Sequence, residues 1–296
     1  MRLALIANPR SGTAPDPREL EALLASDGAD VGYLAIDEIA DQHGGDLQDG
    51  ALAALTAGAR PDRIVVAGGD GSIGPAALCA AELGVPLAVV PVGTANDFAR
   101  ARDVPRDLEE ACALARDPGA ATGRAELGLA AGRPFVNAAS TGLAIVAAHA
   151  AKPYKPRLGP LAYAVGALHA GLTASALRCA VVCDGRRGFA GRAWQVVVGV
   201  TGAFGGGSEI GGTRPADGLL DVAVVPAGSR LGLARRAVGM RMGRLTEQAG
   251  VAHARGAVIE VQTAGDAPFN VDGETCRCEP ARFTLHSAGF DVVTPA

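Results

Sequence analysis

The sequence predicts a two-domain α+β protein, in which an α/β domain with a doubly wound parallel sheet precedes a mostly antiparallel β domain. Its 296 residues suit about two domains. Up to about residue 124, short apolar runs alternate with helical patterns, which is typical of a parallel sheet with crossover helices. After that point strand-like runs follow one another directly, as they do in antiparallel sheets.

Four apolar runs in the first part are predicted strands: Arg2–Asn8, Val31–Ile36, Ile64–Ala67 and Leu87–Val90. The last two are short and continuously apolar, which is typical of strands buried on both faces. After the first run, Asp16 suits a helix N-cap and Pro17 the first helical position. A later helical pattern ends at Gly84.

Five strand-like runs occupy the second part: Cys179–Cys183, Trp194–Thr201, Leu220–Val225, Val258–Gln262 and Arg282–His286. Between the first two lies Asp184-Gly185, a dipeptide that favours a tight hairpin turn. Helices are expected near residues 158–172 and 230–247. We interpret the first helix as buried rather than membrane-spanning, because Ala and Gly dominate it.

Composition narrows the function classes. Apolar residues make up 49% of the chain and charged residues 20%, which indicates a folded globular protein. The net charge of −4 lacks the basic footprint of a nucleic-acid binder, so no nucleic-acid partner is expected. The apolar start of the chain is too short for a secretory signal, and we predict a cytoplasmic location.

Six cysteines are scattered along the chain: Cys79, Cys112, Cys179, Cys183, Cys276 and Cys278. They lack the paired spacing of a structural zinc site. We therefore predict that they are small buried hydrophobic side chains.

The strongest chemical signal is the loop after the strand Ile64–Ala67, which reads Gly68-Gly69-Asp70-Gly71-Ser72. Without Cβ atoms, backbone N–H groups can closely approach phosphate oxygens. The N-terminus of the helix that follows favours an anion. An acid in this loop suggests a divalent cation or a substrate hydroxyl. The alternative is a tight strand–helix turn that needs glycine only for its geometry.

A second loop follows the next strand and contains Gly93, Thr94, Asn96 and Asp97. It is expected at the carboxyl end of a neighbouring parallel strand, where open α/β sheets bind ligands. The alternative is that Thr94 and Asp97 form a capping pair for the following helix.

Several motifs together resemble the diacylglycerol kinase catalytic domain, which bacterial soluble lipid kinases and sphingosine kinases share. In chain order they are Asn8-Pro9-x-Ser11-Gly12, Gly68–Ser72, Gly93–Arg100, Phe204–Gly207, Asp217–Val222 and Asn270–Glu274. The resemblance implies an NAD kinase/diacylglycerol kinase-like fold. Its nucleotide-binding domain would cover 1–124 with a C-terminal return at 284–296, and a β-rich lipid-substrate domain would cover 125–283.

The resemblance also implies ligands and roles. The ATP-binding residues would be Asn8, Gly68, Gly69, Asp70, Gly71, Ser72, Gly74, Gly93, Thr94 and Asn96. Asp70 and Asp97 would join a catalytic magnesium–water network, and Glu274 would be the general base. A structural Mg²⁺ would be held by the Asp217 carboxylate and by the carbonyls of Arg214 and Leu219.

The implied activity is transfer of the γ-phosphate of ATP to a lipid hydroxyl, with diacylglycerol as the default acceptor. The alternatives are a kinase for a soluble acceptor, such as an NAD or sugar kinase, and a non-catalytic nucleotide-binding regulator. The lipid partner implies peripheral contact with the inner face of a membrane, and a homodimer stays open. The basic helix Arg230–Arg244 is a candidate for that contact, although a solvated basic face is the favoured interpretation.

Overall fold

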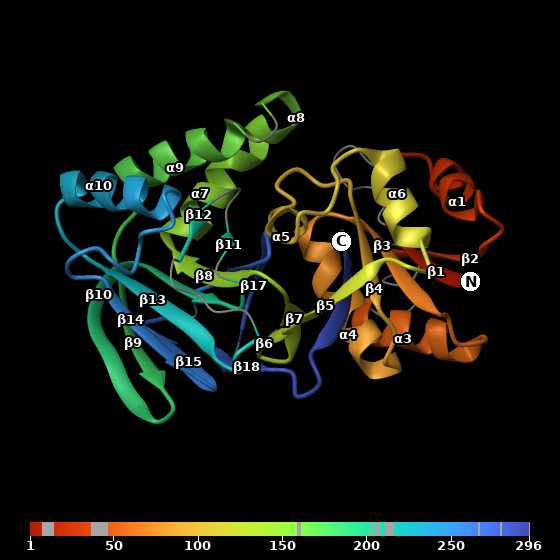
Figure 1. Ribbon diagram of the computed structural model, residues 1–296. Helices are drawn as coiled ribbons and strands as arrows, with labels where there is room; N and C mark the ends of the chain where they lie inside the picture. Colours follow the sequence, from red (N-terminus) through yellow and green to blue (C-terminus); the bar gives the residue numbers. More distant parts are fainter. Residues whose placement is uncertain are drawn as a thin grey trace. The chain divides into compact units, whose positions relative to one another are not determined.

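The computed structural model describes residues 1–7, 15–36, 47–158, 161–201, 203–204, 208–210, 216–265, 267–278 and 280–295. The chain divides into two compact units. The first unit comprises Met1–Leu127 with Ser287–Ala296, and the second comprises Gly128–His286. In Figure 1 the blue C-terminal strand runs among the orange and yellow elements of the first unit.

The first unit is built on a six-stranded sheet in the order β2-β1-β3-β4-β19-β5. Its strands are β1 (Arg2–Ala7), β2 (Asp30–Ala35), β3 (Arg63–Gly68), β4 (Leu87–Pro91), β5 (Ala121–Ala125) and β19 (Phe290–Thr294). β1 to β4 pair in parallel, β19 continues parallel to β4, and β5 closes the edge antiparallel to β19. The predicted parallel sheet is confirmed.

Helices cover both faces of this sheet, as Figure 1 shows. On one face α1 (Pro17–Ala25) packs against α6 (Leu108–Arg116), and on the other α3 (Leu47–Ala57) packs against α4 (Asp70–Leu83). The short α5 (Asp97–Ala101) follows β4. As predicted, the Asp16 carboxylate caps α1 by accepting from the Arg18 N–H at 2.8 Å. Gly84, in the left-handed conformation, ends α4 as predicted.

The second unit is dominated by an antiparallel sheet that contains eleven strands in the described residues. These are β6 (Gly128–Ala130), β7 (Arg133–Phe135), β8 (Ala138–Gly142), β9 (Leu177–Cys183), β10 (Arg186–Gly199), β13 (Leu220–Pro226), β14 (Ala252–Gly256), β15 (Val258–Thr263), β16 (Phe269–Val271), β17 (Glu274–Cys276) and β18 (Arg282–Leu285). The short β11 (Ala203–Phe204) and β12 (Ser208–Glu209) pair separately. Asp184 and Gly185 both have positive φ and form the predicted turn between β9 and β10.

Helices of the second unit lie between β8 and β9 and after β13. They are α7 (Leu143–Ala151), the 3₁₀ turn η1 (Lys152–Tyr154), α8 (Lys155–Leu158), α9 (Leu161–Thr173) and α10 (Arg230–Arg241). α9 packs against α7 through small residues: Ala162 and Ala170 are fully buried, and a Cβ on Gly166 would collide with the Ala147 carbonyl oxygen.

The prediction of a buried helix at 158–172 is wrong. Leu161, Leu168 and Leu172 on α9 are 68%, 68% and 66% exposed. The small residues of α9 fit the close contact with α7, so its leucines point the other way. Within the described residues, no helix has both the length and the hydropathy needed to span a bilayer.

We predict that the returning strand β19 is essential to the first unit. Phe290 is 1% exposed and stacks on the buried Phe98 with ring centroids 6.1 Å apart. Phe290→Ala should destabilise this unit by roughly 3–5 kcal/mol, because it leaves a cavity in a packed core. Hydrogen exchange of the β4 amides should become about a hundredfold faster or more.

The control is Asp291→Ala, which lies in β19 next to Phe290 and removes an exposed ion pair with Arg124 of β5. It should change the free energy of unfolding by less than about 1 kcal/mol. Equal exchange rates in the two variants would contradict the assigned role of β19.

Candidate active site

The two glycine loops lie side by side at the carboxyl edge of the first sheet. β3 ends at Gly68 and β4 at Pro91, and the Val92 N–H donates to the Gly68 carbonyl at 3.2 Å. A Cβ on Gly93 would overlap the Cα of Gly69 and lie 2.7 Å from Asn96 Oδ1. Glycine is therefore required at Gly93 because the two loops are in backbone contact.

The first loop runs directly into α4. Gly69 is the N-cap and provides no side-chain hydrogen bond, and the helix begins at Asp70. Gly69 to Ser72 are all partly exposed, whereas Gly74 is buried in the helix. A helix of 14 residues presents a partial positive charge at this end, which favours a phosphate group.

Asp70 joins this loop to the second one. Its Oδ1 accepts from the Phe98 N–H at 3.0 Å, so the carboxylate of one loop caps the helix that follows the other. Asn96 adopts the left-handed conformation, with φ of 49°, and its side chain stabilises the second loop through hydrogen bonds to the backbone of the same loop. Its Oδ1 accepts from the Gly93 N–H at 3.1 Å, and its Nδ2 donates to the Gly93 and Pro91 carbonyls at 2.9 and 3.3 Å.

Thr94 and Asp97 do not form the capping pair that was the alternative interpretation. α5 begins at Asp97 with Asn96 as its N-cap, and Thr94 is exposed in the loop before it. Asp97 is only 4% exposed and forms an ion pair with Arg100 one turn later. The buried Asp97 thus stabilises this loop, while the Thr94 hydroxyl lies at its surface.

Glu274 follows a tight turn in the second unit. Asp272 and Gly273 have φ of 45° and 94°, and they connect β16 to β17 as the Asp-Gly signal predicts. The Asp272 carboxylate also accepts from the N–H groups of Val136, Asn137 and Ala138 at 2.7, 3.1 and 3.0 Å. The turn is thereby anchored to the segment that leads into β8.

The Glu274 carboxylate is exposed and paired with an arginine. Its side chain is 58% exposed and forms an ion pair with Arg133, the first residue of β7. Sequence reasoning missed Arg133, because 141 positions separate the two residues and no local motif links them. Only the antiparallel sheet brings them together.

The carboxylate of Asp217 is occupied by protein groups. It pairs with Arg255, and its Oδ1 accepts from the Leu219 N–H at 3.3 Å. Arg255 also reaches Asp221 at 3.2 Å, and His253 Nε2 lies 2.6 Å from the same carboxylate, which is 1% exposed. The hydrogen bond to Asp217 raises the pKa of Arg255 above its ordinary value.

The resemblance assigns the Asp217 carboxylate to a structural Mg²⁺, and in this structure the Arg255 guanidinium pairs with that carboxylate. In the described part of the chain, no cluster of three or more His, Cys, Asp or Glu side chains could hold a metal ion. Three other predicted site elements, Asn8, Arg214 and Gly205–Gly207, lie outside the described residues. The metal site at Asp217, Arg214 and Leu219 stays a prediction.

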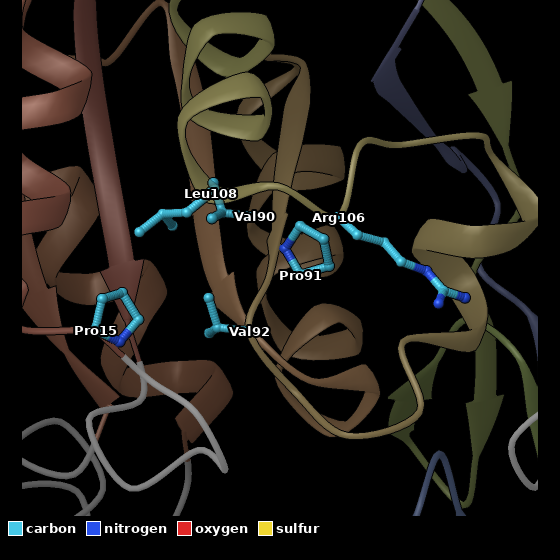
Figure 2. Close-up of a pocket in the computed structure, with 6 residues that line it drawn as sticks. All are labelled: Pro15, Val90, Pro91, Val92, Arg106 and Leu108. Carbon is cyan, nitrogen blue, oxygen red and sulfur yellow. The ribbon is translucent and has the colours of Figure 1, made fainter. Parts of the chain in front are cut away.

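A small pocket of about 130 Å³ lies at the carboxyl end of β4. Figure 2 shows its lining residues, Pro15, Val90, Pro91, Val92, Arg106 and Leu108. The Arg106 side chain extends away from Val90 and Val92. The volume is below that of typical ligand sites, about 300–1,000 Å³, so this pocket by itself is too small for a nucleotide.

Known proteins match both units. Residues 2–124 match the family model described as the diacylglycerol kinase catalytic domain. Residues 137–294 match the one described as the YegS C-terminal NAD kinase beta sandwich-like domain. A Pseudomonas syringae pv. tomato protein named probable lipid kinase YegS-like is 34% identical over 263 residues, covering 85% of this chain and 81% of the relative. The chain belongs to the diacylglycerol kinase catalytic-domain family.

Further members and structures agree with this family assignment. A Staphylococcus aureus protein named diacylglycerol kinase is 28% identical to this chain. The match covers 99% of this chain and 92% of the relative. The crystal structure of a diacylglycerol kinase from Bacillus anthracis has a TM-score of 0.76 at 24% identity, covering 99% of this chain and 96% of that one. An NAD kinase from Archaeoglobus fulgidus in complex with ATP has a TM-score of 0.51 at 14% identity, covering 99% and 94%. These two structures confirm the predicted fold class.

The contact between the two glycine loops leads to a prediction about the stability of the first unit. Gly93→Ala should destabilise the first unit by roughly 1–3 kcal/mol, because its Cβ would force the loops apart. Gly58→Ala is the matched control, since nothing lies within 4 Å of a Cβ at that position. Thermal unfolding followed by circular dichroism should show a lower Tm for Gly93→Ala alone. Identical melting curves would mean that the loops do not touch.

Proposed function

We propose that this protein is an ATP-dependent lipid kinase that transfers the γ-phosphate to a lipid hydroxyl, with diacylglycerol as the first acceptor to test. The observation that carries the proposal is the backbone contact between the two glycine loops, Gly93 against Gly69. It gathers a glycine-lined helix N-terminus and the exposed Thr94 at one edge of the sheet. The names of the relatives, lipid kinase and diacylglycerol kinase, support the substrate class.

The phosphates of ATP are assigned to the first loop. Its glycines allow backbone N–H groups to approach phosphate oxygens, and the positive end of α4 stabilises their charge. Mg²⁺ would arrive with ATP as part of the substrate, since this ion prefers phosphate oxygens together with one or two carboxylates. Asp70 and Asp97 are the carboxylates of these loops, and each also holds a loop together.

Glu274 is assigned the role of general base. The acceptor hydroxyl would lose its proton to this carboxylate while its oxygen forms a bond to the γ-phosphorus and the bond to the departing ADP breaks. The side chain is exposed, so a lipid hydroxyl can reach it, and Arg133 holds it in place. The Asp272–Gly273 turn fixes the backbone directly before it.

The kinase assignment predicts that Glu274→Gln lowers kcat by about 10²- to 10⁴-fold, because the base is lost. The binding of ATP should be unchanged. The measurement is transfer of labelled γ-phosphate to mixed micelles that contain one candidate lipid at a time, with Mg²⁺ supplied. Glu260→Gln is the matched control, since it also neutralises a partly exposed carboxylate paired with an arginine in the second unit.

The outcomes separate the competing functions. If wild type and Glu274→Gln label a lipid at the same rate, Glu274 is not the general base, but the protein is still a lipid kinase. Label only in a soluble acceptor such as NAD would favour the soluble-acceptor kinase. ATP binding without any transfer would favour a nucleotide-binding regulator.

We further propose that α9 contacts the lipid surface. Leu161, Val165, Leu168 and Leu172, here called the α9 stripe, are all exposed and spaced by four, three and four residues. That spacing places them on one face of the helix. Exposed apolar stripes of this kind mark docking surfaces, and a basic border favours anionic lipid.

Basic residues are present around the α9 stripe. Lys152 and Arg157 are exposed in the segment before α9. Arg230 at the start of α10 donates to the carbonyls of Gly171 and Ala174 near the end of α9. Two arginines of the predicted basic helix, Arg230 and Arg236, donate to backbone carbonyls, so we assign the lipid contact to the apolar α9 stripe.

The variant with Leu161, Leu168 and Leu172 all changed to Ser should bind anionic vesicles at least about tenfold more weakly. It lacks three apolar side chains that would become buried in the lipid when the helix binds. The control is Ala164→Ser with Ala167→Ser, which adds hydroxyls at exposed positions of α9 but keeps the leucines. Vesicle sedimentation measures the affinity. Unchanged sedimentation together with a loss of dimer in light scattering would assign the α9 stripe to a homodimer instead.

A further inference from the structure

Two cysteines next to Glu274 lie close together. The Sγ atoms of Cys276 and Cys278 are 3.5 Å apart. Residues two apart in a regular strand are separated by about 6.6 Å. β17 ends at Cys276, so the chain has left the strand by Cys278, and its thiol can turn toward that of Cys276.

We propose that Cys276 and Cys278 are a redox-active dithiol that hydrogen peroxide closes to a disulfide, and that the disulfide shifts the Glu274 strand. The first part stands on the geometry of the two thiols alone. The second part is regulatory and rests on the proposed function of Glu274.

Cys276 differs from the other cysteines of the chain in its exposure. It is half-buried, whereas the other five, Cys79, Cys112, Cys179, Cys183 and Cys278, are buried. Burial raises the pKa of the Cys79 thiol to about 12 and that of the Cys112 thiol to about 11, which makes them inert. An oxidant in solution therefore meets Cys276 first.

The surroundings of Cys276 favour its thiolate. The hydrogen bond from Cys278, assisted by the charge of Arg133, lowers the pKa of Cys276 to about 7, although partial burial and Glu274 oppose this. The same hydrogen bond, with burial, raises the pKa of Cys278. Cys276 is thus the nucleophile, and Cys278 retains the proton as the resolving thiol.

The chemistry balances with peroxide as the oxidant. The Cys276 thiolate attacks one peroxide oxygen, the O–O bond breaks, and hydroxide leaves to become water, so that Cys276 becomes a sulfenic acid. The sulfur of Cys278 then attacks the sulfenic sulfur, its proton and the hydroxyl group leave as a second water, and the S–S bond forms. Two thiols and one peroxide give one disulfide and two waters.

Closure of the disulfide pulls on the Glu274 strand. An S–S bond is about 2.05 Å long, so the two sulfurs must approach from 3.5 Å. β17 forms the edge of its sheet and pairs through only three residues with β16, which makes it easy to displace. Glu274 and Cys276 are two positions apart on β17 and therefore share a face, and Arg133 interacts with both.

The first test follows the thiols and does not involve kinase activity. The full chain is treated with peroxide, alkylated and analysed by mass spectrometry. The peptide with both cysteines should lose about 2 Da, and dithiothreitol should restore it. Cys278→Ser should stop at a sulfenic acid that dimedone labels, whereas Cys276→Ser should react no faster than the buried thiols.

A Cys179→Ala variant, which lacks a buried thiol outside the pair, should behave like wild type. Absence of the Cys276–Cys278 disulfide, or equal dimedone labelling of Cys276→Ser and Cys278→Ser, would overturn the proposal that these two cysteines form a redox-active dithiol.

The second test follows phosphate transfer. Oxidised wild type should lose at least about tenfold in lipid phosphorylation and recover it with dithiothreitol, while Cys276→Ser should keep its activity in peroxide. If the disulfide forms without changing the rate of lipid phosphorylation, the proposed regulation is overturned, while the redox-active dithiol itself is retained. If the reduced protein phosphorylates no lipid, the proposed function fails, and the thiol measurement still decides the dithiol.

Discussion

The structure of the candidate site depends on the backbone contact between Gly69 and Gly93. Because neither residue has a Cβ, the loops after β3 and β4 approach closely enough for Asp70 of one to cap the helix that follows the other. That capped helix carries Phe98, whose ring stacks on Phe290 of the returning C-terminal strand. One steric requirement thus couples the helix N-terminus, the second loop and the last strand of the chain into one unit.

In the second unit, hydrogen bonding to carboxylates has the same organising effect. Asp272 accepts three backbone N–H groups and so fixes the turn that precedes Glu274. Asp217 and the buried Asp221 share Arg255, which supplies the positive charge that a buried acid needs. Arg133 and Arg255 therefore act as structural cations, each paired with a carboxylate that lies far away in the sequence.

Most secondary structure follows from local patterns. Continuous apolar runs predict β3 and β4, Asp16 and Pro17 predict the start of α1, and Asp184-Gly185 predicts a hairpin. α9 is the instructive exception. Its small residues were interpreted as filling a core, but they allow close contact with α7 and leave the leucines exposed. Helical periodicity identifies two faces, and only the neighbouring helix decides which one is buried.

The sequence by itself determined the fold class, the family and the two glycine loops, because each depends on residue types at short, fixed spacing. The glycines at 68–71 and the turn at Asp272-Gly273 can be recognised without any partner. Only the tertiary structure paired Arg133 with Glu274 and showed that the Asp70 carboxylate, not the Thr94–Asp97 pair, caps α5. Such pairings depend on strand order and on where the backbone bends, and neither is encoded in a local pattern of residues.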